Sequence, residues 1–182
     1  MLFLTDPQRT PRPDLDAEML PKGAGVVFRA FGAADAVALG RRLRAVTRRR
    51  GLMLLVGADP ALARAIDADG VHLPQRLAHL AGRLRRARPG WIVTAAAHDW
   101  PAILRARRAG AQAVLLSPVF DSASPSAGKA LGVVRFATLA RRTGLPVYAL
   151  GGIDATTARR LTSAGAAGIA AVSALVSSGI RT

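Results

Sequence analysis

The sequence predicts a (β/α)8 TIM barrel that is compact and has shortened helices. Short apolar runs of strand length alternate with Ala-, Arg- and Leu-rich segments of helical period, the pattern of parallel strands joined by crossover helices. The chain has 182 residues and 51% hydrophobic content, which suffices for one core. We therefore expect a single domain over residues 1–182, with an open doubly wound sheet as the alternative fold.

Eight apolar runs are expected to form strands, and eight is the number that closes such a barrel. In chain order they are Leu2–Thr5, Gly25–Arg29, Leu52–Val56, Gly70–Leu73, Trp91–Ala95, Ala113–Leu116, Pro146–Leu150 and Gly168–Val172. Residues 66–73, 108–116 and 163–172 repeat one theme of helix end, small residues and strand, as repeated βα units do. The usual barrel has about 250 residues, so some helices must be trimmed, and the Pro-rich span 10–21 leaves room for only a stub of the first.

Arginine dominates the charge of the chain. The formal charge is +15, from 26 Lys and Arg against 11 Asp and Glu. Arginine pairs recur near the ends of predicted helices, where cations meet the negative helix terminus, so we expect solvated outer faces. Aromatic residues make up only 4%, and no helix-turn-helix pattern is present. We expect nonspecific adhesion to polyanions but no specific nucleic-acid partner.

Cysteine is absent, which excludes disulfides and thiolate metal sites and fits a cytoplasmic location. The apolar start, Met1–Thr5, is too short for a signal peptide, and no apolar run reaches the roughly 18 residues of a membrane span. We expect no membrane contact.

Two glycines point to a small phosphorylated ligand. The strand 146–150 runs into Gly151 and Gly152, and the strand 168–172 ends at Ser173, before a helix expected from about Ala174. Glycine has no Cβ, so a phosphate can approach its N–H group, and a helix start directs positive charge to the same point. The glycine pair alone also fits a plain turn; the second strand and its short exit favour a phosphate cradle.

Chemistry in a barrel belongs at the carboxyl ends of the strands. The longest segment there is the loop 117–132, which holds Ser122, Ser124 and Lys129 and is a candidate lid. Lys129 is one of only two lysines. It fits either a solvated loop residue or a clamp on a bound phosphate.

Six motifs follow one another in the order of a known family. They are Leu4-Thr-Asp6, Val27-Phe-Arg29, Ala68-Asp-Gly-Val-His-Leu-Pro-Gln75, Ser117-Pro-Val-Phe120, Ala149-Leu-Gly-Gly-Ile153 and Gly168-Ile-Ala-Ala-Val-Ser173. Together the motifs resemble the thiamine phosphate synthase family, which includes the thiazole tautomerases. The resemblance implies a (β/α)8 barrel. Synthases of that family join a hydroxymethylpyrimidine diphosphate to a thiazole phosphate with Mg²⁺, whereas its tautomerases isomerise a thiazole carboxylate phosphate.

The resemblance assigns roles to individual positions. The family's thiazole-phosphate cradle falls on Gly151, Gly152, Val172 and Ser173. Arg29 matches the arginine that contacts the pyrimidine diphosphate, and Ser122 and Ser124 fall on the Thr-x-Thr positions after the sixth strand. The resemblance thus implies that binding of a thiazole phosphate is retained.

The departures from the family pattern fall on its chemistry. Val27 and Phe31 stand where the family has Gln and Lys, and Gly57-Ala58 stands for its Asn-Asp. Pro74-Gln75 replaces Gly-Gln, and the acidic position that follows falls near Leu77. The Mg²⁺ implied by the resemblance thus lacks both expected carboxylates, which should weaken stabilisation of a diphosphate leaving group.

Two residues near the missing groups are candidate replacements. Asp59 lies one residue from the lost carboxylate, and Lys129 shares a loop with Pro125, which occupies the position of the family's lysine. Lys129 and Arg29 are therefore the expected catalytic residues. Asp59 would serve only if its loop shifted, and no metal ligands are assigned.

The histidine that tautomerases need after the sixth strand falls on Pro118. His72 and His98 lie elsewhere near the rim, and each fits a structural hydrogen bond or a catalytic role. We expect the structural role for both, keep His72 and Gln75 as possible site residues, and expect His79 to face solvent from a helix.

Three functions stay open. The chain is an active synthase with rebuilt metal and lysine contacts, a metal-independent tautomerase-like isomerase, or a phosphate-ligand binding protein without catalysis. A homo-oligomer is possible in each case.

Overall fold

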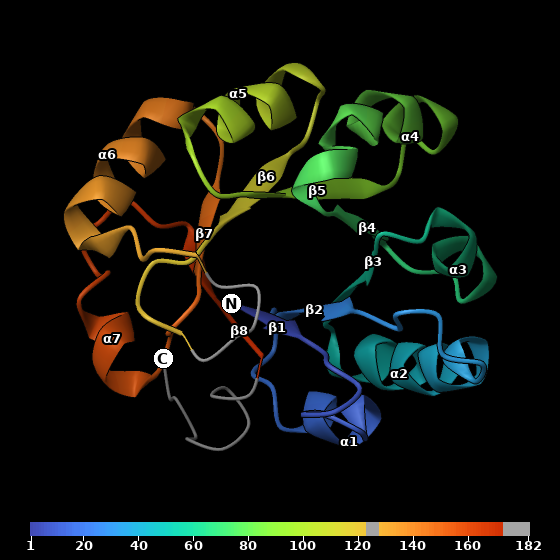
Figure 1. Cartoon of the computed structure of the whole chain (residues 1–182). Helices are drawn as coiled ribbons and strands as arrows, with labels where there is room; N and C mark the ends of the chain where they lie inside the picture. Colours follow the sequence, from blue (N-terminus) through green and yellow to red (C-terminus); the bar gives the residue numbers. More distant parts are fainter. Residues whose placement is uncertain (123–127, 173–182) are drawn as a thin grey trace.

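The computed structural model describes residues 1–122 and 128–172 and shows a closed barrel of eight parallel strands (Figure 1). The strands are β1 (Leu2–Leu4), β2 (Gly25–Phe28), β3 (Met53–Gly57), β4 (Gly70–Leu73), β5 (Ile92–Ala97), β6 (Ala113–Leu116), β7 (Val147–Leu150) and β8 (Gly168–Ala171). The last strand pairs with the first through Leu2 with Ala170 and Phe3 with Ala171, which closes the ring. The predicted barrel is confirmed, and each strand ends within two residues of its expected bounds.

The helices form a ring outside the strands (Figure 1). They are α1 (Pro13–Glu18), α2 (Ala36–Arg50), α3 (Pro60–Ala65), the 3-10 helix η1 (Gln75–Leu80), α4 (Ala81–Ala87), α5 (Trp100–Arg108), α6 (Gly132–Thr143) and α7 (Ala155–Arg159). Helices α1, α3 and α7 have only five or six residues, so the predicted shortening is confirmed. The helix expected from about Ala174 lies outside the described residues. No helix of the described part is both long and apolar enough to cross a membrane.

Aspartates start three of the helices. The side chain of Asp59 accepts a hydrogen bond from Leu62 N at 2.9 Å, and that of Asp99 accepts one from Ala102 N at 2.7 Å. Asp154 caps α7 by accepting from the backbone N–H groups of its first turn. A helix start has unpaired N–H groups and a positive partial charge, so a carboxylate stabilises it. These helices begin at the carboxyl ends of strands, so three acidic side chains of that face serve as caps.

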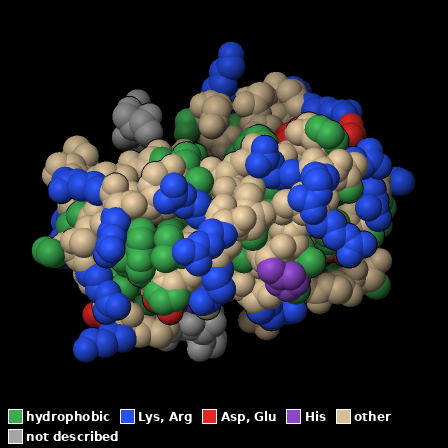
Figure 2. Space-filling model, turned by 90° about the horizontal axis from the view of Figure 1, so that it is seen from above, with side chains coloured by type: hydrophobic (Ala, Val, Ile, Leu, Met, Phe, Trp, Pro, Cys, Tyr) green, Lys and Arg blue, Asp and Glu red, His purple; other side chains and the backbone are tan. Residues whose placement is uncertain are grey.

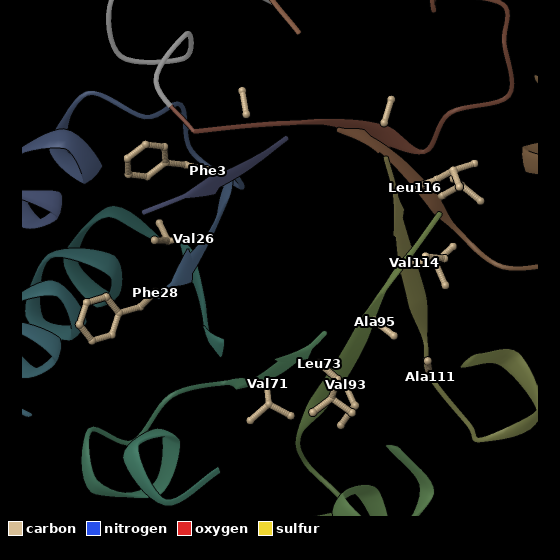
Figure 3. Packing of buried hydrophobic residues seen from close by; sticks show 14 of the residues in the cluster. Phe3, Val26, Phe28, Val71, Leu73, Val93, Ala95, Ala111, Val114 and Leu116 are labelled. Atoms are coloured by element: carbon tan, nitrogen blue, oxygen red, sulfur yellow. The ribbon is translucent and has the colours of Figure 1, made fainter. Parts of the chain in front are cut away.

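The larger core lies between the strands and the helices. Figure 3 shows buried side chains such as Phe3, Phe28, Val71 and Leu116 pointing from the strands away from the barrel axis. Alternate residues of one strand point to opposite faces, so the residues between them point into the barrel. The strands are therefore covered on both faces, as parallel strands normally are.

A smaller core fills the barrel itself. Its buried members are Leu2, Leu4, Val27, Leu55, Leu115 and Ala170. Glycines make room for their larger neighbours: a Cβ on Gly25 would lie 2.5 Å from Leu2 Cδ2, and one on Gly168 would lie 2.9 Å from the Tyr148 ring. Large side chains therefore fill the space that a glycine leaves free on the neighbouring strand.

One carboxylate ties several elements together where the strands begin. Asp69, just before β4, receives hydrogen bonds from Arg44 Nη1 at 2.9 Å and Nη2 at 2.7 Å, and from Leu54 N at 2.7 Å. Its backbone accepts a further bond from Ile92 N at 3.0 Å. Asp69 thereby joins α2, β3 and the start of β5, and a bidentate Arg–carboxylate pair adds geometric specificity.

We expect Asp69→Asn to lower the free energy of unfolding by about 2 kcal/mol. Losing one partner of a buried pair costs about 3–5 kcal/mol, and the side chains of Arg44 and Asp69 are 14% and 32% exposed, which screens part of this. Asp67→Asn is the matched control, because Asp67 pairs with Arg48 on the open surface. Urea unfolding of both variants checks the prediction. Equal losses would contradict the role assigned to Asp69.

Candidate functional site at the barrel mouth

Barrel closure brings the carboxyl ends of all eight strands to one face. Arg29 follows β2 there, and its side chain lies over β3, because a Cβ on Gly57 would come within 3.1 Å of Arg29 Cγ. His72 lies on β4 between two residues of the outer core, so its ring points into the barrel. The structure thus brings two residues that the sequence singled out to the same mouth.

Arg29 is held by the loop that follows β1. Its Nε donates to Thr5 O at 2.6 Å, its backbone N–H donates to Thr5 Oγ1 at 2.9 Å, and its Nη2 lies 3.5 Å from Asp6 Oδ2. Burial lowers the pKa of Arg29 from its usual value, and the negative charge of Asp6 opposes this shift. The guanidinium therefore sits in a fixed position with part of its charge balanced.

Strained backbone borders Arg29. Phe31 has φ 48° and Ala58 has φ 62°, in the left-handed region that residues with a Cβ rarely adopt. Phe31 is 71% exposed, and Arg29 Cζ lies 5.3 Å from its ring centroid. Phe31 and Ala58 stand at the positions where the family has Lys and Asp. The rim at β2 and β3 therefore presents an aromatic ring and a methyl group in place of a cation and an anion.

His72 is buried inside the barrel, at 8% exposure. Its Nδ1 lies 2.9 Å from Thr94 Oγ1 on the neighbouring strand. Burial, aided by the positive charge of Arg29, lowers the pKa of His72 to about 4, so the ring is neutral at physiological pH. The hydrogen bond expected at the rim is found deeper, between two strands.

The glycine pair after β7 has a structural reason that the sequence did not reveal. A Cβ on Gly151 would lie 2.8 Å from Pro118 Cα, and one on Gly152 would lie 2.4 Å from Asp121 O. Phe120 N also donates to Gly151 O at 3.1 Å. The glycines therefore let the β6 loop cross directly over the end of β7, a structural reason for the pair that stands beside the predicted phosphate cradle.

The same loop returns to its starting point. Leu131 N donates to Pro118 O and Gly132 N donates to Val119 O, both at 2.9 Å. The exposed Lys129 thus lies in a loop anchored at both ends to the mouth. Ser122 and Val172 are half-buried, whereas Ser124 and Ser173 lie outside the described residues. Whether the loop acts as a lid stays a prediction.

His98, expected near the rim, lies against the end of β6. Its Nδ1 lies 2.7 Å from Ser117 O and 3.2 Å from Ser117 Oγ, at the end of β6. Gln75 Oε1 accepts from His98 N at 3.1 Å. An imidazole therefore lies against the residue before Pro118, the position where a histidine was missed. The sequence signal for this position is that His98 directly follows the end of β5 at Ala97.

The described side chains fit a Mg²⁺ ion poorly. Asp59 is committed to its helix cap, Asp6 to Arg29, and Leu77 packs against the core where an acid was expected. Within residues 1–122 and 128–172, no three acidic or histidine side chains are grouped as metal ligands. Mg²⁺ prefers several oxygen ligands that include carboxylates, and a role for Asp59 as the missing ligand stays a prediction that requires its loop to shift.

Comparisons with known proteins agree on one family. A family model described as thiamine monophosphate synthase matches residues 2–175. A putative thiamine-phosphate synthase 2 of Aquifex aeolicus is 33% identical over 74% of this chain and 72% of its own length. The thiamine-phosphate synthase of Geobacillus kaustophilus is 32% identical over 96% and 83%, and that of Roseiflexus sp. RS-1 is 37% identical over 79% and 61%. The solved structure of a thiamine phosphate pyrophosphorylase from Pyrococcus furiosus superposes with a TM-score of 0.83 at 26% identity, covering 96% of this chain and 86% of that one.

We expect His72 to make the protein less stable in acid. The pKa of His72 is 6.5 in the unfolded chain and about 4 in the folded protein, so the unfolded chain takes up the proton first as the pH falls. The free energy of unfolding is therefore highest above pH 6.5 and decreases as the pH falls toward about 4. The full effect is about 3 kcal/mol, at about 1.4 kcal/mol per pKa unit. His72→Gln should flatten the fall in unfolding free energy between pH 6.5 and 4, measured by urea unfolding. Parallel curves for the two proteins would contradict this assignment.

Proposed function

The chain belongs to the thiamine monophosphate synthase family of thiamine biosynthesis, and on this premise we propose that it binds a thiazole phosphate at the ends of β7 and β8. The match over residues 2–175 carries the proposal, because it spans all eight strands and the mouth that they form. Gly151 and Gly152 offer backbone without side chains at the end of β7, beside the end of β8 at Val172. Ser173 and Ser124 complete the proposed cradle.

Cations near the mouth suit an anionic ligand. Lys129 extends from the anchored β6 loop, and its long flexible side chain can reach a phosphate beside that loop. Ser122 offers a hydroxyl from the same loop. Arg29 is fixed on the opposite side of the mouth, at β2, where it suits the second substrate of a synthase. In the proposed arrangement the thiazole phosphate lies by β7 and β8, and a pyrimidine diphosphate lies toward Arg29.

Condensation is the larger step of the proposal. It joins the thiazole nitrogen to the pyrimidine methylene carbon, and the diphosphate leaves with the bonding electrons. The negative charge that develops must be stabilised for the reaction to be fast. Arg29 and Lys129 are the proposed side chains for this role, because the rim carboxylates that would hold a metal are absent or serve the fold.

A second candidate function is a metal-independent isomerase related to the thiazole tautomerases. His98 favours it. Nδ1 of its ring contacts Ser117, which leaves Nε2 to face a ligand in the proposed reaction. A neutral imidazole can accept a proton at one point and return it at another. A binding protein without turnover is the third possibility.

The decisive assay combines purified protein with hydroxyethylthiazole phosphate, hydroxymethylpyrimidine diphosphate and Mg²⁺, with an active synthase as control. We expect the thiazole phosphate to raise the melting temperature, as any ligand of the native state does. Formation of thiamine phosphate would establish the condensation. No product, but exchange of ligand protons with D₂O that His98→Gln abolishes, would favour the isomerase. No effect on melting would refute the proposed binding.

We expect Lys129→Ala to raise the Kd of hydroxyethylthiazole phosphate about tenfold, because a hydrogen bond to a charged group contributes about 1.5–3 kcal/mol. Lys22→Ala is the control, since it removes an equal charge before β2, at the opposite end of the barrel. Calorimetry gives both constants. The melting temperature without ligand should not change, because Lys129 is exposed. An unaltered Kd would remove Lys129 from the site.

A further inference from the structure

A hollow of about 470 Å³ lies beside the barrel mouth, between η1 and α5. It is lined by Pro74, Gln75, Arg76, Ala78, His79, His98 and Arg105. Its volume falls within the range of small-ligand sites, about 300–1,000 Å³. The proposed thiazole phosphate site lies at the ends of β7 and β8, so this hollow lies outside it, although His98 and Gln75 border both the hollow and the mouth.

The lining brings together two arginines and two histidines. Arg76 and His79 come from η1, His98 from the loop after β5, and Arg105 from α5. None of the described residues that line the hollow is acidic. Asp99, next to His98 in sequence, directs its carboxylate to the start of α5 as a cap. The charge of the hollow is therefore not balanced from within.

The surroundings add to this field. Fifteen of the 26 Lys and Arg follow residue 69, against three of the 11 Asp and Glu, so residues 70–182 carry +12 of the formal +15. In the described part of that region, no arginine or lysine pairs with a carboxylate; the ion pairs of the described residues all lie before residue 70. Figure 2, which views the molecule from above, shows Lys and Arg side chains spread over that side, with histidine among them and few acidic groups.

Hydrogen bonds fix the proton on each histidine ring. Nδ1 of His79 lies 3.2 Å from Arg76 O, and Nδ1 of His98 lies 2.7 Å from Ser117 O. A carbonyl oxygen can only accept, so each Nδ1 carries a proton and donates it. Nε2 of each ring is therefore the nitrogen that is left to contact a ligand.

We propose that this hollow binds a phosphate group of a small anionic ligand, held by Arg76 and Arg105, with the rings of His79 and His98 beside it. Guanidinium groups offer forked donors that match phosphate oxygens. No Phe, Tyr or Trp is among the described lining residues, so there is no platform for stacked bases, which favours a small anion over single-stranded nucleic acid. The proposal is independent of the thiazole phosphate site.

Calorimetry with inorganic diphosphate and the full-length protein tests the proposal. We expect the double variant Arg76→Ala/Arg105→Ala to weaken binding at least tenfold. The matched control is Arg83→Ala/Arg108→Ala, which removes the same charge from exposed arginines outside the hollow and should change the Kd less than twofold. All four side chains are exposed, so unchanged melting temperatures confirm that folding is intact.

Equal weakening in the two double variants would overturn the proposal, because it would assign binding to the general field of the arginine face. Tight binding of a DNA or RNA duplex that both variants weaken equally, with a steep dependence on salt, would overturn it in favour of a polyanion partner.

Free phosphate, diphosphate and nucleotide monophosphates, compared at one pH, separate an inorganic anion from a phosphate ester.

Discussion

The closing pair of the barrel, β1 with β8, is the constraint on which the rest of the structure depends. Among the described residues, two pairs join these strands in register, and without this pairing the remaining seven would form an open sheet with two free edges. Closure also brings the first and the last strands together, so that Arg29 and the glycine pair face one opening although they are more than 120 residues apart in sequence. Every contact of the mouth therefore presupposes a complete ring.

The two ends of the ring are held in different ways. Where the strands begin, Asp69 joins a helix and two strands through short bonds that no ligand needs. Where they end, aspartates cap helices, and the loops between them carry the chemistry. Stability and function thus depend on separate polar groups, and this separation explains how the rim at β2 and β3 carries Phe31 and Ala58 while the barrel remains intact.

Much of the fold follows from local patterns, because strand-length apolar runs and helical periods need no knowledge of distant residues. The eight strands, the stub of a first helix and the solvated arginine faces were all predictable in this way. The site was less so. Neither the cap bond from Leu62 N to Asp59 nor the contact of His98 with Ser117 could be predicted from the sequence. Such facts depend on where loops from different strands meet, which sequence spacing does not encode. The assignments of Gln75, Ser122 and Val172 to the ligand remain predictions.

The glycine pair after β7 has a consequence for how such chains are recognised. Its missing side chains make room for Pro118 and Asp121 of the chain itself, so the pair is needed whether or not any ligand is present. A descendant of this barrel that had lost every substrate would still have to keep both glycines or rebuild the loop above them. The motif is therefore a signature of architecture, and relatives that share it are best sorted into catalysts and non-catalysts by the residues that follow β2 and β3.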